Sequence, residues 1–226
     1  CELAMWNLTG RTDSKLAFNN DRIDDAAFLE RCRDRQSFTT ICRYLILKTQ
    51  VLYLYNETEL ALECAQEADR SIAYILGHFQ RTEHHFYYSL CLCDRYPHVG
   101  EQQQQTYWRR LEANQAQMKI WSENCPENFE HKYLLVAAEM ARITDRALVA
   151  MDLYDRAIEG ARNNEFLQDE ALANELAAKF WRDRGKTEFA RLYLTNARYN
   201  YQLWGAKRKV EELEQSYPQL LARHTT

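Results

Sequence analysis

Residues 150–161 read AMDLYDRAIEGA, residues 190–201 read ARLYLTNARYNY, and residues 61–72 read ALECAQEADRSI. All three stretches carry alanine at their first and eighth positions, at the spacing of one face of a helix. Alanines at these points let two helices approach closely, and larger side chains fill the groove between them. The recurrence therefore predicts helices that pair through small residues and stack one pair upon another.

The segment before residue 150 supplies the first helix of such a pair. Leu134, Ala138 and Ala141 lie 16, 12 and 9 residues before Ala150, where the first helix of a tetratricopeptide pair carries its packing residues. The step from Ala150 to Ala190 is 40 residues, longer than the usual repeat of ~34. We therefore predict an all-α fold, a TPR-like (tetratricopeptide-like) α-solenoid of stacked antiparallel helix pairs with longer-than-usual helices. A non-repeating helical bundle is the alternative.

Helical periodicity runs between sparse glycines and prolines, which break or cap helices. The expected helices span residues 23–33, 37–55, 57–75, 79–94, 102–122, 127–143, 145–162, 165–184, 186–203 and 206–216. We expect residues 1–22 to be a cut helix end and a linker. Residues 23–223 are expected to form a TPR-like helical repeat domain.

The charge balance argues against nucleic acid as a partner. The 226 residues include 29 basic and 33 acidic side chains, for a net charge of −4, and phosphate neutralisation needs clustered lysine and arginine. No apolar run approaches the ~18 residues of a membrane span, so no membrane partner is expected. No signal peptide is recognisable either. Because the chain begins at Cys1, we interpret it as a piece of a longer polypeptide.

The cysteines indicate a reducing, cytoplasmic setting. There are seven, at no framework spacing, and several fall on apolar helix faces, where a free thiol behaves as a small hydrophobe. Cys91 and Cys93 are two residues apart in a helical segment, so their side chains diverge and cannot easily share a metal. We expect neither a metal site nor a cofactor.

Two motifs could carry chemistry. Residues 184–187 (RGKT) imitate the end of a phosphate-binding loop, but Phe180 stands where the first glycine is needed, and a helix is expected where the motif needs a strand. His84, Tyr88 and Cys91 share a helix face, so a thiol–imidazole pair is conceivable, yet no third group that would orient it can be named. We therefore expect no catalytic residues.

The remaining candidate site is the concave groove that stacked helix pairs form along their first helices. Its mixed charge would suit a peptide or another domain better than an apolar ligand. The predicted lining consists of Arg43, Gln50, Lys132, Glu139, Arg142, Glu175, Lys179 and Arg182. The alternative is that these residues only solvate the concave face.

Several stretches resemble one known family. They are HFYYSL (85–90), PENFEHKYLLVAAE (126–139), AMDLYDRAIEGA (150–161), FLQDEALANELAAKF (166–180), WGAK (204–207) and YPQLL (217–221). Over residues 38–221 the chain is similar to the helical region of very large bacterial signalling proteins. In those proteins a serine/threonine kinase domain leads, followed by a predicted ATPase module, the helical region, a GAF domain and a sensor histidine kinase.

This resemblance implies a cytoplasmic multidomain kinase in which the chain is a sensing or coupling arm that binds a protein, a neighbouring domain or an inducer. The kinase and ATPase motifs of the family are absent from these residues, so the chain itself is expected to be non-catalytic. The alternative is a peptide- or ligand-sensing repeat domain of a transcription regulator. A helical enzyme is a third reading, and it would need an enclosed pocket with convergent polar groups.

Overall fold

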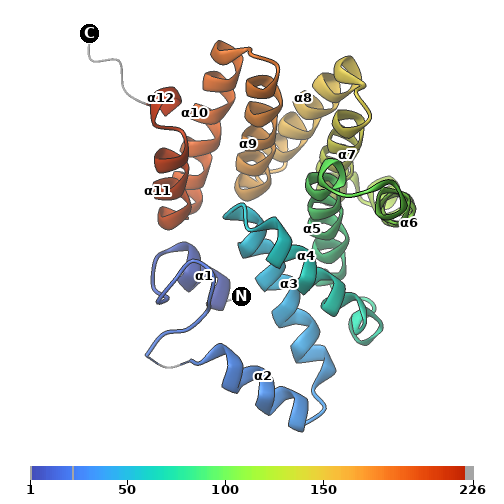
Figure 1. Cartoon of the computed structure of the whole chain (residues 1–226), viewed down its shortest axis with the longest axis vertical. Helices are drawn as coiled ribbons and strands as arrows, with labels where there is room; N and C mark the ends of the chain where they lie inside the picture. Colours follow the sequence, from blue (N-terminus) through green and yellow to red (C-terminus); the bar gives the residue numbers. More distant parts are fainter. Residues whose placement is uncertain (1, 22, 222–226) are drawn as a thin grey trace. The chain divides into compact units, whose positions relative to one another are not determined.

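The computed structural model describes residues 2–21 and 23–221, and within them every extended regular element is helical (Figure 1). The helices are α1 (Glu2–Leu8), α2 (Asp25–Asp34), α3 (Phe38–Leu54), α4 (Thr58–Asp69), α5 (Gln80–Arg95), α6 (Glu101–Asn124), α7 (Pro126–Ile143), α8 (Ala147–Asn163), α9 (Leu167–Asp183), α10 (Thr187–Trp204), α11 (Lys207–Ser216) and α12 (Pro218–Leu221). Two 3-10 turns, η1 (Ile72–Ile75) and η2 (Tyr96–His98), complete the order.

The all-α prediction is confirmed, and the helix bounds lie close to those expected. The one marked difference is the helix expected at 57–75, which ends at Asp69 and is followed by η1. The predicted segments 1–22 and 23–223 include residues 1, 22 and 222–223, which lie outside the described residues. Part of the expected cut helix end is present as α1.

The chain divides into two compact units, residues 1–116 and 117–226, with the boundary inside α6. In the first unit α3 packs against α4 and α5, and α1 and α2 rest on α3. Its core is rich in aromatic and aliphatic side chains, among them Phe86, Tyr87 and Leu90, each at most 1% exposed. The division into units leaves the predicted single repeat domain over 23–223 a prediction.

In the second unit α7, α8, α9 and α10 follow one another side by side, each packed on the next (Figure 1). The alanines expected at close helix contacts are buried there: Ala138, Ala150, Ala157, Ala190 and Ala197 are all at most 1% exposed. Stacked neighbouring helices in contact are therefore confirmed. A regular TPR-like superhelix stays a prediction.

The turns between helices repeat one backbone motif. In the turns α2–α3 and α3–α4, and in the four turns from α7 to α11, a residue in the left-handed region follows the helix. The next N–H then bonds back five residues, as Arg146 N does to Ala141 O at 2.9 Å. This is the Schellman cap, which satisfies carbonyls at a helix end. The left-handed residues are Gln36, Asn56, Asp145, Glu165, Gly185 and Gly205. The last four follow one another every 20 residues, so the 40-residue step of the sequence is two helix-and-turn units of equal length.

Candidate functional site

Among the predicted groove residues, Lys132 is buried and paired. Its Nζ donates to Asp169 Oδ2 at 2.8 Å, and His131 Nε2 lies 2.9 Å from the same oxygen. Burial by itself would raise the pKa of Asp169, but the charge of Lys132 and the hydrogen bond from His131 outweigh it, so that the pKa is lowered. These three side chains, each at most 4% exposed, tie α7 to α9.

Glu175 is the centre of a second buried cluster. Its carboxylate accepts from Lys209 Nζ at 3.0 Å and from Tyr201 Oη at 2.9 Å, and Lys179 Nζ lies 3.3 Å away. Burial opposes ionisation, but the charges of Lys209 and Lys179 outweigh it and lower the pKa of Glu175 to about 2. The cluster joins α9, α10 and α11.

Glu139 on α7 is another buried carboxylate with hydrogen-bond donors around it. It is 2% exposed and accepts hydrogen bonds from the Arg142 guanidinium and the Tyr154 hydroxyl. Lys132, Glu139 and Glu175 therefore cross-link helices in the second unit instead of facing solvent. Buried ion pairs of this kind hold their position because an unpaired buried charge is strongly destabilising.

The other predicted residues are more accessible. Arg43 is exposed, and half-buried Gln50 donates to Tyr87 Oη at 3.2 Å, both in the first unit. Arg182 is exposed, bonds to Asp183 at 2.9 Å, and stacks on Tyr217 with 5.5 Å from its guanidinium carbon to the ring centroid. Of the eight residues, the structure pairs Glu139 with Arg142 and Glu175 with Lys179. Their binding role stays a prediction.

The thiol and imidazole groups of α5 are packed as structural side chains. Cys91 is fully buried, and burial raises the pKa of its thiol well above the ordinary value. His84 Nε2 lies 3.1 Å from Asp69 Oδ1, and burial lowers the pKa of His84. A thiol with a raised pKa is a poor nucleophile near neutral pH. Among the described residues no group of three or more His, Cys, Asp or Glu side chains could hold a metal ion.

The RGKT motif lies in a turn between two helices. Gly185 is the left-handed residue after α9, with φ of +70°, and Lys186 precedes the first residue of α10. The strand that a phosphate-binding loop requires is replaced by helix α9. These residues are therefore one more Schellman cap of the stack.

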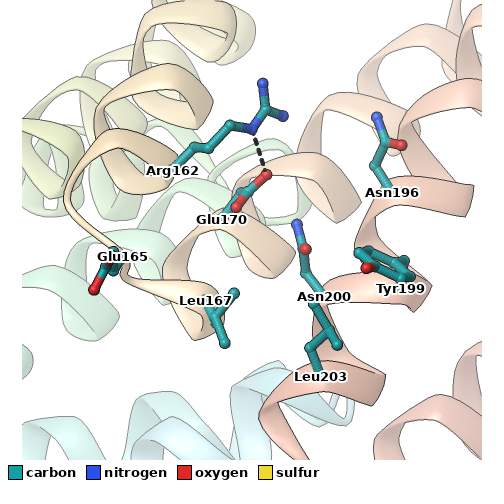
Figure 2. A pocket seen from close by; sticks show the side chains of 8 residues that line it. All are labelled: Arg162, Glu165, Leu167, Glu170, Asn196, Tyr199, Asn200 and Leu203. Atoms are coloured by element: carbon teal, nitrogen blue, oxygen red, sulfur yellow. Dashed lines mark hydrogen bonds and ion pairs between the residues drawn. The ribbon is translucent and has the colours of Figure 1, made fainter.

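A concave site of the second unit lies elsewhere, in a groove of ≈ 660 Å³ where the α8–α9 turn meets the last turns of α10 (Figure 2). Its lining consists of Arg162, Glu165, Leu167, Glu170, Asn196, Tyr199, Asn200 and Leu203. Arg162 Nε donates to Glu170 Oε1 at 2.9 Å across one wall. Most of the remaining lining consists of two amides, Asn196 and Asn200, and three large side chains, Leu167, Tyr199 and Leu203. Such a mixture of apolar surface and a few polar groups is typical of ligand-binding pockets.

Asn200 is the most informative residue of this groove. It is 5% exposed, and its side-chain amide has no hydrogen-bond partner within the described part of the chain. Asn196, four residues earlier, lines the same groove from the same helix face. Buried amides are normally hydrogen-bonded, so an amide left open toward a groove is available to a ligand.

None of the groove residues was in the predicted lining, although α9 contributes to both sets. The sequence carried a partial signal, since Asn196, Tyr199, Asn200 and Leu203 recur at helical spacing on α10. Those positions were interpreted only through the buried alanines of the same helix. The wall formed by Arg162 and Glu170 becomes visible only when α8 and α9 are placed in space.

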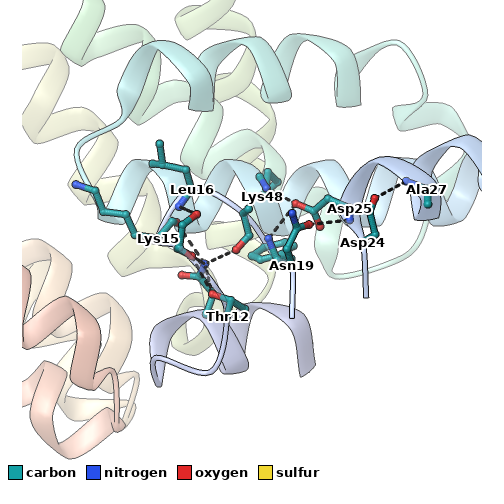
Figure 3. Close-up of polar contacts among 12 residues, drawn as sticks. Thr12, Lys15, Leu16, Asn19, Asp24, Asp25, Ala27 and Lys48 are labelled. Atoms are coloured by element: carbon teal, nitrogen blue, oxygen red, sulfur yellow. Dashed lines mark hydrogen bonds and ion pairs between the residues drawn. The ribbon is translucent and has the colours of Figure 1, made fainter. Parts of the chain in front are cut away.

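A polar network in the first unit links the segment between α1 and α2 to α3 (Figure 3). Lys48 Nζ pairs with Asp25 Oδ2 at 2.7 Å, and Asn19 Oδ1 accepts from the Asp25 amide at 2.8 Å. Asn7 Nδ2 lies within 3.1 Å of Thr12 Oγ1 and of a backbone carbonyl. These contacts hold the segment between α1 and α2 against α3, which is a structural role.

No membrane-crossing segment is found in residues 2–21 and 23–221, because none of their helices is both long and apolar enough.

Comparison with known proteins finds a partial relative. A curated protein of Dictyostelium discoideum, Hybrid signal transduction histidine kinase G, is 36% identical to the chain over 104 residues. The match covers 46% of this chain and 3% of that protein, so the chain spans a small fraction of the relative's length. No family model and no solved structure matches the sequence. The chain is thus a weak, partial homologue of a hybrid histidine kinase.

Proposed function

We propose that this chain is a non-catalytic, TPR-like coupling arm of a cytoplasmic multidomain signal-transduction kinase. It binds a protein or a neighbouring domain, and this binding changes the activity of the catalytic domains. The observation that carries the proposal is the 36% identity over 104 residues to a hybrid signal transduction histidine kinase. The sequence resemblance to kinase, ATPase and GAF domain proteins supports the same setting.

The organisation of the polar groups supports a scaffold. Asp169 and Glu175, the most deeply buried ion-paired carboxylates of the second unit, are each held by a buried lysine at 2.8 to 3.0 Å. Because each carboxylate is buried and paired, it stiffens the contact between two helices, and its charge is not available to a substrate. A stiff stack of helices transmits a displacement from one end to the other because packed interfaces repack in discrete steps.

The test uses the full-length kinase that carries this arm. Replacing residues 23–221 by a flexible Gly/Ser linker should change basal or stimulated autophosphorylation at least several-fold. ATP affinity of the catalytic domains serves as the control and should stay unchanged. The isolated 226-residue chain should transfer no phosphate from labelled ATP. Unchanged autophosphorylation after the replacement, or phosphoryl transfer by the isolated chain, would refute the proposal.

A further inference from the structure

Helix α10 carries an apolar stripe on its solvent side. Phe189, Leu192, Asn196, Tyr199 and Leu203 succeed one another at steps of 3, 4, 3 and 4 residues, the spacing of a coiled-coil seam. The four large side chains of this α10 stripe are 51%, 57%, 60% and 53% exposed. From 189 to 203 the stripe runs for about 21 Å, or four helical turns.

The same face of α8, the second helix of the preceding pair, is mostly charged or polar. Positions 40 residues earlier on α8 are Val149, Asp152, Arg156, Glu159 and Asn163. Asp152 and Arg156 form an exposed ion pair at 3.6 Å. The two helices occupy equivalent places, since Ala150 and Ala190 are both 0% exposed. Large apolar side chains therefore occupy four of the five positions on α10, whereas the only apolar residue of the five on α8 is Val149. An exposed apolar surface of this extent marks an interaction site.

The α10 stripe continues into the groove. Asn196, Tyr199 and Leu203 belong to both, while Arg162 and Glu165 stand on the facing wall (Figure 2). The carboxylate of Glu165 is exposed and has no ion-pair partner among the described residues, whereas Arg162 is bonded to Glu170. The surface thus combines an apolar ridge, an open amide at Asn200, and one uncompensated negative charge.

We propose that the α10 stripe and its groove bind an amphipathic helix of a partner protein. The partner helix has apolar residues at heptad spacing and a lysine or arginine that meets Glu165. Ridges of side chains at steps of 3 and 4 pack into the grooves of another helix with the same periodicity. This inference deepens the proposed function, because it names the kind of partner that the coupling arm takes.

A helix fits this surface better than a second copy of the chain. Two copies related by a two-fold axis place the same patch against itself. Such a copy would offer Glu165 only the Arg162 of its own patch, which is already bonded to Glu170. A separate helix is convex and about 10 Å wide with its side chains, so it fills the groove and covers the stripe at once.

The test measures binding of a defined probe to the 226-residue chain. The probe is a fluorescein-labelled helical peptide with leucine at the a and d positions of three heptads and lysine at the flanking positions. Fluorescence anisotropy should show saturable binding. A peptide of the same composition with the heptad order scrambled should bind at least tenfold more weakly.

Variants place the binding on α10. Leu192→Glu and Leu203→Glu should each weaken probe binding at least tenfold, while their helical circular dichroism stays unchanged because both positions are exposed. Leu148→Glu is the matched control: Leu148 is 80% exposed on α8, outside the stripe, and its replacement should leave binding unchanged. Glu165→Gln should reduce binding several-fold and reduce its salt dependence.

Three results would overturn the inference: no saturable binding up to about 1 mM peptide, equal binding of the scrambled peptide, or equal weakening by Leu148→Glu. Sedimentation tests whether a second copy of the chain occupies the surface instead of a partner helix. A dimer that Leu192→Glu dissociates would show that it does, and would also overturn the inference. The assay needs no kinase output. Probe binding with unchanged autophosphorylation after arm replacement would refute only the coupling role, and the reverse combination would refute only the helix site.

Discussion

Glu175 offers the sharpest test of how the second unit is held together. Its carboxylate is 1% exposed and bonds to Lys209, which is 0% exposed, at 3.0 Å. Glu175→Gln keeps the shape of the side chain and removes the charge, so that Lys209 retains only Glu212, at 2.9 Å, as a charged partner. The pairing fastens α11 onto α9, and the variant should therefore destabilise the C-terminal end of the stack.

The magnitude follows from the pKa. The value falls from an ordinary 4.5 to about 2 in the folded chain, and each unit corresponds to about 1.4 kcal/mol. A carboxylate with a depressed pKa contributes stability that is fully present above its unfolded pKa and is lost as the pH falls toward the folded value. Glu175→Gln should thus lower the free energy of unfolding by roughly 3 kcal/mol at pH 7, and by about half as much at pH 3.

The assay is urea denaturation followed by helical circular dichroism at both pH values. Glu188→Gln is the control, because Glu188 forms an exposed pair with Arg191 at 3.4 Å, and exposed pairs contribute about 0–1 kcal/mol. Replacing Lys209 by methionine in the Glu175→Gln background should recover stability, since no buried charge then lacks its partner. A loss below about 1 kcal/mol at pH 7, or an equal loss at pH 3, would refute the reasoning.

Three further results are expected. Ala157→Leu should overpack the α8 contact and lower stability by about 1–3 kcal/mol, whereas Arg156→Leu on the exposed face should change it little; equal thermal midpoints for both would contradict the close helix contact. Asp145→Gly should raise stability by up to about 1 kcal/mol, because Asp145 has a φ of +54° that glycine adopts without strain, and a lower urea midpoint would count against this. Cys91, whose thiol pKa is raised by burial, should react with a thiol reagent far more slowly in the native chain than half-buried Cys125; mass spectrometry of the labelled peptides would show the reverse order if this is wrong.

Periodicity alone was sufficient to predict most helices of this chain, although the helix expected at 57–75 ends at Asp69 and α12 was not expected. The alanines of residues 150–161 and 190–201 lie on one face because a helix turns every 3.6 residues, and the structure buries Ala150, Ala157, Ala190 and Ala197. Helical order of this kind depends on residues that are close together in the sequence. The sequence also predicted that the helix of residues 165–184 ends before Gly185, and α9 ends at Asp183, since glycine adopts the left-handed conformation freely.

The caps at Gln36, Asn56, Asp145 and Glu165 escaped sequence reasoning. Asn56 and Asp145 give a weak local sign of a Schellman turn, because asparagine and aspartate visit the left-handed region more readily than other side chains with a Cβ. Gln36 and Glu165 give none. The turn forms there because the two backbone bonds of the cap and the packing of the helices on either side outweigh the strain. The left-handed cap at helix ends without glycine is thus decided in part by tertiary contacts.

Candidate sites depended even more on the third dimension. Lys132, Glu139 and Glu175 were predicted to face an open groove, because charged residues on a helix are usually solvated. Their partners Asp169, Tyr154 and Lys209 lie 15 to 37 residues away, a separation over which sequence carries no contact signal. The sequence by itself determined the helices and their small-residue faces, because both follow from local periodicity. Only the tertiary structure decided which charges are buried, where the groove lies, and which face of α10 stays apolar and uncovered, because each of these requires side chains from two or more helices to meet.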